Sequence, residues 1–557
     1  MNKRAIKVLE FYKIIEMLES KTSSSLGENE IQNIAINKDI ETVKKRLNET
    51  KEVVDIINNY GLIPFGVLHD LNDEMRIASI GSFLTIKQIL KVKATMSTAR
   101  RIKAYIVKIE KSEKRFPIIN TLVNSIQSFK YLEDEITSVI ISEDEISDHA
   151  SPELFKIRTN IRKANEHIRS KLDNIISNPK TQKYLQDTLI TVKNDRFVVP
   201  VKSNYKNMIK GIVHDRSASG LTLYIEPNAI VRLNNKLKGY KMDEEVEIER
   251  ILYELTAKIN EISNRILSNQ IVLKKIDAII AKASLSIEME AIVPRINNDK
   301  YIRIVNGRHP LIIKNEVVPL NVWVGKEFTS LVITGPNTGG KTVALKTIGL
   351  LTIMTMAGLH IPADYGTEIS IFNEVYADIG DEQSIEQSLS TFSSHMTNIV
   401  EILKNVTSDS LVLFDELGAG TDPTEGAAIA TSILKELFKK NVRTVSTTHY
   451  NELKEYALIE NGIENACVEF DVETLSPTYK ILVGVPGKSN AFDISRKLGL
   501  SDDVIDEAQK HIKRENVQFE EIISHIEKDR KISEKERDEA INLRIEIERM
   551  KKKLDEE

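Results

Sequence analysis

Gly335-Pro-Asn-Thr-Gly-Gly-Lys-Thr342 determines the class of fold to which this 557-residue chain belongs. The apolar run 331–334 precedes it and the helix-like segment 343–351 follows it. Strand, glycine-rich turn and helix in that order predict a P-loop, in which backbone N–H groups and the N-terminus of the helix surround phosphate oxygens. We expect Lys341 to reach the β- and γ-phosphates and the Thr342 hydroxyl to ligate Mg²⁺. The predicted nucleotide-binding residues are Gly335, Pro336, Asn337, Thr338, Gly339, Gly340, Lys341 and Thr342.

Length and composition restrict the class of protein. A chain of 557 residues is too long for one ordinary domain, so about two to four domains are expected. Charged residues make up 29% and aromatic residues 6%, a balance that favours long, solvated helices over a compact β protein. The single Cys467 excludes an internal disulfide and a cysteine metal site. The N-terminus does not match a signal peptide and no window is apolar enough for a membrane span, so we expect a cytoplasmic protein without a membrane partner.

Hydrophobic periodicity predicts a long arm in the middle of the chain. A helix over 155–176 is followed by short strand-like runs, and then by about 60 residues of helix with weak breaks at Gly239 and near Asn269. Helix out, small sheet and helix back describe an antiparallel coiled-coil arm with a β-rich tip. The predicted domains are a helical core or platform (1–150), the long-helix arm with its β-rich tip (151–295, tip about 185–227), a P-loop domain of parallel α/β type (296–500) and a charged helix or linker (501–557).

Positive charge is concentrated on this arm. Residues 155–216 contain 14 Lys and Arg against five Asp and Glu. A solvated helix face is the usual meaning of a charge run, but here one sign dominates and extends onto the tip. Such a surface suits contact with a nucleic-acid phosphate backbone. The candidate contacts are Lys193, Arg196, Lys202, Lys206, Lys210 and Arg216.

Three further residues carry the predicted chemistry of the P-loop domain. Asp415 and Glu416 follow the apolar strand 411–414. In a P-loop protein the first acid would hold the Mg²⁺ shell through water, and the second would act as the base that polarises the attacking water. His449 follows the next strand-like run, where it could sense the γ-phosphate. The alternatives, a helix-capping acid pair and a structural histidine, are weakened because all three lie in the same α/β segment as Lys341.

With these residues in place, the chain resembles the ATPase domain of the MutS family, which belongs to the ABC-type ATPases. The resemblance implies ATP and Mg²⁺ as cofactors and ATP hydrolysis as the activity. It also implies a homodimer, in which Ser390 would reach the nucleotide of the other subunit. The motifs that carry it are 335–342, Ser390-Thr-Phe-Ser-Ser-His-Met396, 413–421 and 447–449.

Two departures make the chain similar to the MutS-two branch of this family. No Phe-x-Glu motif precedes Phe155, and the helical platform begins almost at residue 1, where mismatch readers carry further domains. The tip sequence 211–220 also looks like this branch. Its members are implied to suppress homologous recombination through branched DNA and to rescue stalled or collided ribosomes. Full members end in an Smr domain with nuclease or RNA-binding activity; this sequence stops at Glu557, before such a domain, and no nuclease residue is predicted.

Three functions therefore remain open on the sequence. The first is an ATP-hydrolysing homodimeric clamp on DNA, and the second is a ribosome-splitting ATPase for which ribosomal RNA is the main target. Both would use phosphate contacts, so the sequence does not separate them. The third is a structural coiled-coil ATPase, which would need longer helices than the roughly 60 residues seen here.

Overall fold

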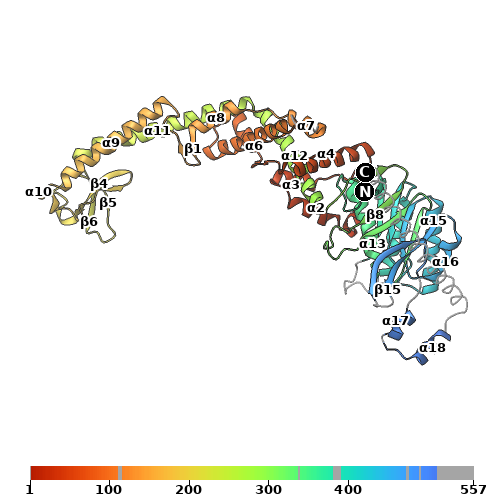
Figure 1. Cartoon of the computed structure of the whole chain (residues 1–557). Helices are drawn as coiled ribbons and strands as arrows, with labels where there is room; N and C mark the ends of the chain where they lie inside the picture. Colours follow the sequence, from red (N-terminus) through yellow and green to blue (C-terminus); the bar gives the residue numbers. More distant parts are fainter. Residues whose placement is uncertain are drawn as a thin grey trace, which may run out of the picture. The chain divides into compact units, whose positions relative to one another are not determined.

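The structure is a computed structural model that describes residues 2–110, 116–336, 339–380, 391–471, 476–487, 491–497 and 499–510 (Figure 1). It divides into two compact units. The sheet unit takes its described residues from 1–63, 116–119 and 275–557, and the arm unit takes them from 64–115 and 120–274. Within the described ranges, no helix is both long and apolar enough to cross a membrane. The chain is a multidomain mixture of α and α/β parts, as predicted.

The sheet unit is built on a six-stranded sheet in the order β12-β13-β14-β10-β15-β16. All neighbouring pairs are parallel except β15 and β16. The strands β10 and β13 are buried at every position, which is typical of parallel strands covered on both faces. The bounds are β10 (Ser330–Thr334), β12 (Glu374–Asp378), β13 (Ser410–Phe414), β14 (Arg443–Thr448), β15 (Ile463–Asp471) and β16 (Ser476–Val483).

Alternate side chains of β13 enter two different hydrophobic cores. Leu411 and Leu413 pack with α13 on one face, whereas Val412 and Phe414 pack with the helices of the other face. This period of two is what a strand between two helical layers requires. The covering helices are α13 (Lys341–Met356), α14 (Thr391–Asn405), α15 (Pro423–Lys439) and α16 (Asn451–Ile459), and α17 (Ala491–Lys497) and α18 (Asp502–Lys510) follow the sheet.

The N-terminal helices belong to the sheet unit. Helix α13 is buried along almost its whole length, so its outer side needs a second apolar layer. Leu9, Ile14 and Leu47 join the same core as α13 and supply part of that layer. These helices are α1 (Lys3–Val8), α2 (Phe11–Glu19), α3 (Ser25–Gln32) and α4 (Ile40–Tyr60), and a smaller sheet in the order β7-β11-β8-β9 (Arg295–Asn297, Glu368–Ser370, Ile302–Gly307 and Leu320–Val324) completes the unit. The domain boundaries predicted at 150, 295 and 500 stay predictions.

Two long helices run side by side in the arm unit. Helix α9 (Pro152–Ile176) and helix α11 (Asn228–Glu261) pack along each other, with strands β4, β5 and β6 at their far end (Figure 1). Ser151 caps α9, because its hydroxyl accepts from the Leu154 N–H at 3.0 Å. The other elements that lie in, or begin or end in, this part of the chain are α5 (Asn72–Ser79), α6 (Ile86–Glu110), α7 (Pro117–Asn124), α8 (Lys130–Val139), β1 (Ile140–Ser142), β2 (Glu145–Ile146) and α12 (Ser263–Glu288).

The tip is a four-stranded antiparallel sheet in the order β3-β4-β6-β5. Val199, Leu223 and Ile225 form one core with Ile168 of α9 and Leu237 of α11, so one face of the sheet covers the ends of both helices. The bounds are α10 (Pro179–Gln182), β3 (Thr191–Lys193), β4 (Arg196–Lys202), the 3₁₀ turn Ser203–Tyr205, β5 (Gly211–Arg216) and β6 (Thr222–Pro227).

The predicted breaks in the returning helix were wrong. The helix is interrupted at Ile262, whose φ of −113° and ψ of 8° are not helical. Gly239 lies inside α11 in open space, where a single glycine costs only about 1 kcal/mol of helix stability. Asn269 lies inside α12, and its side chain exchanges two hydrogen bonds with the backbone of Gln127. Of the predicted charged helix, the structure describes α18; residues 511–557 lie outside the described residues.

Candidate nucleotide site

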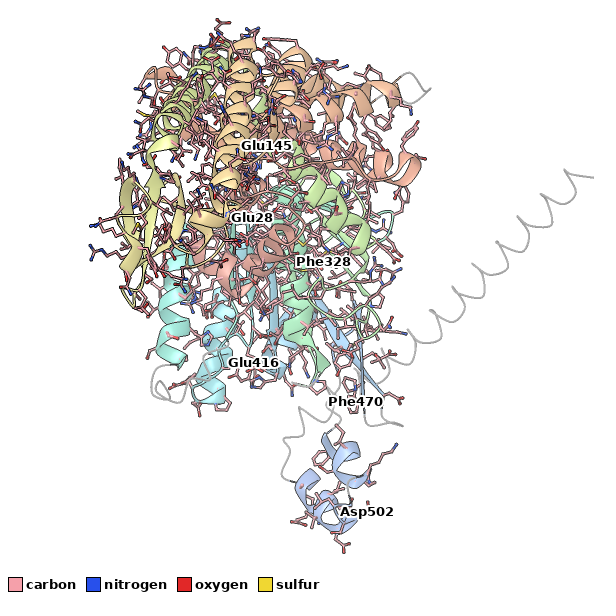
Figure 2. All side chains as sticks on the ribbon, turned by 90° about the vertical axis from the view of Figure 1, so that its left-hand side faces the viewer. Glu28, Glu145, Phe328, Glu416, Phe470 and Asp502 are labelled. Carbon is pink, nitrogen blue, oxygen red and sulfur yellow. The ribbon has the colours of Figure 1, made fainter. Side chains whose placement is uncertain are left out.

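The predicted catalytic residues meet at one edge of the six-stranded sheet. The strands β13, β14 and β10 are adjacent and parallel, so their carboxyl ends lie side by side. Asp415 and Glu416 follow β13, His449 follows β14, and the glycine-rich loop follows β10. Figure 2 shows Glu416 at the lower end of the sheet, the same end that Phe470 of β15 reaches. The topology therefore places His449 between the acids and the P-loop.

Lys341 and Thr342 begin helix α13 directly after the loop. The Lys341 side chain is 2% exposed, and its Nζ donates to the carbonyl of Gly335 at 2.6 Å. Burial lowers the pKa of the Lys341 ammonium, and the Glu416 and Asp415 carboxylates oppose that shift. The Thr342 hydroxyl donates to Asp415 Oδ2 at 2.6 Å. The structure thus brings together the residues predicted to hold phosphate and metal.

Thr447 is a site residue that the sequence analysis did not single out. Its hydroxyl donates to Asp415 Oδ1 and accepts from the Glu416 N–H at 2.8 Å. Glu416 has a φ of 47°, in the left-handed region that non-glycine residues rarely adopt and that often marks functional sites. Thr447 therefore holds the carboxylate of Asp415 and the backbone of Glu416. Its position in the quoted motif 447–449 was the available signal.

His449 is exposed at the end of β14, and its ring centroid lies 4.4 Å from that of Tyr450. The buried Tyr450 hydroxyl donates to the Gly418 carbonyl at 3.0 Å. Burial raises the pKa of Tyr450, so the phenol keeps its donating proton. Tyr450 thereby links the histidine to the loop that follows Glu416.

A cavity of about 400 Å³ opens at this edge. Its lining includes Thr342, Asp415 and Glu416, together with Phe392 and His395 of α14. The hydroxyl and carboxylate oxygens are hard ligands that suit Mg²⁺. Mg²⁺ is usually held by one or two protein oxygens together with substrate phosphates and water, and Thr342 and Asp415 would supply the protein oxygens here. Three predicted site residues, Asn337, Thr338 and Ser390, lie outside the described residues.

Tyr479 of β16 is a second residue missed from the sequence. A Cβ atom added to Gly340 would lie 2.8 Å from Tyr479 Cδ1, so the ring lies directly against the P-loop. The side chain is 51% exposed, and its backbone φ is 60°. An exposed aromatic ring in strained backbone beside a phosphate loop provides a surface for a planar base. No local motif pointed to this tyrosine.

At the arm tip, the six predicted nucleic-acid contacts fall into two groups. Arg196 Nη1 pairs with the buried Glu226 at 2.9 Å, Lys193 pairs with Asp215 at 3.2 Å, and Lys202 Nζ donates to a backbone carbonyl at 3.4 Å. These three therefore also have roles within the tip. The remaining three, whose side chains are exposed, are Lys206, Lys210 and Arg216.

Comparison with known proteins gives consistent matches. The family model described as MutS domain V matches residues 331–516. A protein named Endonuclease MutS2 from Alkaliphilus oremlandii is 56% identical over 535 residues, which cover 96% of this chain and 68% of that protein. A protein of the same name from Clostridioides difficile is 52% identical, and the match covers 100% of this chain and 70% of that protein. Another from Acetivibrio thermocellus is 50% identical, and the match covers 96% of this chain and 68% of that protein.

Proposed function

The chain belongs to the MutS family and is of the MutS2 type, and we therefore propose that it is an ATPase that acts as a homodimeric clamp on nucleic acid. The observation that carries the ATPase proposal is the hydrogen-bonded group formed by Thr342, Asp415 and Thr447 beside the buried Lys341. Thr342 lies in the first turn of α13, Asp415 follows β13 and Thr447 lies in β14, and Thr342 and Asp415 line the cavity of about 400 Å³.

Each side chain has a distinct proposed role. Lys341 binds the β- and γ-phosphates, and Thr342 and Asp415 hold Mg²⁺, which would neutralise phosphate charge when bound. Glu416, fixed by Thr447, accepts the proton of the attacking water. His449, between the acids and the P-loop, orients the γ-phosphate. Ser390 is proposed to complete the site of the other subunit, so that ATP binding favours the dimer.

Tyr479 is proposed to stack on the adenine base. Offset stacking of aromatic rings contributes roughly 0.5–1.5 kcal/mol, so Tyr479→Ala should raise the KM for ATP roughly two- to tenfold, with kcat nearly unchanged. Tyr479→Phe, which keeps the ring, is the matched control and should behave as the wild type. Steady-state kinetics with ATP measures both constants. An unchanged KM in the alanine variant would show that the ring does not contact the base.

The arm with its β-rich tip is proposed to close on the phosphate backbone of DNA or ribosomal RNA. The three exposed cations Lys206, Lys210 and Arg216 support this contact. Replacing all three by Glu should weaken duplex binding. The plot of log affinity against log salt should also become less steep, by roughly 0.9 for each phosphate that the tip no longer neutralises. Fluorescence anisotropy at several salt concentrations measures the slope.

The charge control for that experiment replaces three other exposed cations of the arm unit, Arg76, Lys87 and Lys130, which lie outside the basic segment 155–216, by Glu. Because the total charge changes equally, only a local contact would separate the two triple variants. Equal slopes in both would contradict the proposed role of the tip. Whether branched DNA or ribosomes are the main target is decided by a pull-down with the purified chain and a non-hydrolysable ATP analogue. Recovery of ribosomes but not branched DNA would favour ribosome rescue over suppression of recombination.

A further inference from the structure

Asp378 is a buried carboxylate next to the nucleotide site. It ends β12, which pairs in parallel with β13, and it is 2% exposed. His395 Nδ1 donates to its Oδ2 at 2.8 Å, and Asn398 Nδ2 donates to its Oδ1 at 2.8 Å. Its backbone carbonyl accepts from the Asp415 N–H, also at 2.8 Å. Asp378 thus contacts helix α14 through its side chain, and through its backbone it contacts Asp415, which is proposed to hold Mg²⁺.

The two side-chain contacts come from one face of α14. Residues 395 and 398 are three positions apart, so both point to the same side of the helix. A buried carboxylate is costly unless it is paired and hydrogen-bonded, and here α14 supplies both donors. A third contact comes from α1, where Arg4 Nη2 lies 3.6 Å from Asp378 Oδ1 and its side chain is 41% exposed. Asp378 therefore fixes the first turns of α14 at the end of β12.

We propose that Asp378 is a positioning residue that couples helix α14 to Asp415. This proposal rests on the proposed ATPase function. It extends that function to the way in which nucleotide contact in the other subunit would change the position of the residues that hold Mg²⁺. Helix α14 begins at Thr391, directly after Ser390, the residue proposed to contact the nucleotide of the other subunit. A shift of α14 on engagement of that nucleotide pulls on the Asp378 carboxylate. The backbone carbonyl of Asp378 also accepts the hydrogen bond from the Asp415 N–H. The movement is therefore transmitted to Asp415 and to its hydrogen-bond partners Thr342 and Thr447.

The location of the pair supports this coupling over a purely structural role. Asp378 and His395 line the same cavity of about 400 Å³ as Thr342, Asp415 and Glu416. If the pair served stability alone, its removal would lower the melting temperature and leave the kinetics of the folded enzyme unchanged. If it positions Asp415, its removal changes kcat and the Mg²⁺ requirement more than it changes ATP binding.

The test compares the steady-state ATPase activity of the full chain in four variants. His395→Leu and Asp378→Asn should each lower kcat about tenfold or more, with the KM for ATP within about threefold of wild type and a higher Mg²⁺ concentration at half-maximal rate. His395→Asn, which keeps a donor near the Nδ1 position, should restore most of the activity. The kcat of the double variant Asp378→Asn/His395→Leu should lie within about twofold of the kcat of the slower single variant, because both substitutions break the same contact between residues 378 and 395.

The matched control is Glu374→Gln, which neutralises an acid at the other end of β12 that pairs with Lys38 at 2.8 Å. It should leave kcat and the Mg²⁺ requirement unchanged. Should Asp378→Asn fail to fold, the half-buried His395, at 27% side-chain exposure, provides the second route. A folded His395→Leu protein with kcat within about twofold of wild type would overturn the coupling while the ATPase proposal stands. Absence of ATP hydrolysis by the wild type would overturn both.

Discussion

Glu416→Gln should lower ATP turnover by about 100-fold or more while ATP binding is retained, because general-base catalysis contributes roughly 10²–10⁴-fold. The glutamine keeps the shape of the side chain and the backbone contact with Thr447, so the lower rate measures the contribution of proton acceptance. The variant should also accumulate as an ATP-bound dimer, because the closed state is no longer released by hydrolysis. Phosphate release, binding of a fluorescent ATP analogue and sedimentation velocity measure the three effects.

The control for Glu416→Gln is Glu425→Gln, the same chemical change at an exposed position in the first turn of α15. It should turn over ATP at the wild-type rate. Turnover of Glu416→Gln within about threefold of wild type would remove Glu416 from the role of base. In that case the left-handed backbone at this residue would serve only to turn the chain after β13.

Lys341→Ala should lose most of its affinity for ATP. The ammonium is buried beside the phosphate loop, where hydrogen bonds to a charged group contribute roughly 1.5–3 kcal/mol each, so we expect binding about 100-fold weaker. Isothermal titration calorimetry with ATP measures the affinity, and thermal unfolding without nucleotide tests whether the fold is intact.

Lys346→Ala is the matched control for Lys341→Ala, because it removes a lysine from the same helix α13. Lys346 pairs with Glu10 at 3.3 Å, whereas Lys341 Nζ donates to the Gly335 carbonyl of the phosphate loop. ATP affinity should therefore be unchanged in this variant. An equal fall in affinity in both variants would indicate damage to α13 itself and would contradict a specific role for Lys341.

The centre of the sheet unit was predictable from the sequence because buried parallel strands are continuous apolar runs. The nucleotide site is built on two of these runs, which end at Thr334 and Phe414, and on the glycine-rich loop between strand and helix. Asp415 and Glu416 were found because they follow such a run, whereas His449 was found because it follows the strand-like but largely polar segment 443–448. The packing of residues 1–63 onto the sheet unit had no comparable signal, since an amphipathic helix does not show which apolar surface it will cover.

The parts of the site that the sequence did not reveal depend on contacts between distant segments. Tyr479 reaches Gly340 only because β15 and β16 extend the sheet beside the P-loop. The role proposed for Asp378 depends on two side chains of α14 and on the pairing of β12 with β13. At the tip, composition identified the positive charge, but not that Arg196 is held by the buried Glu226.

Whether the chain is an ATPase with Lys341 at its phosphate site is decided by Mg²⁺-dependent phosphate release from ATP, measured on the purified wild type and on Lys341→Ala under the same conditions. The expected result is steady turnover by the wild type that requires Mg²⁺ and is abolished in the variant. Equal phosphate release by both proteins would contradict the proposed site, as would wild-type protein that binds ATP and releases no phosphate.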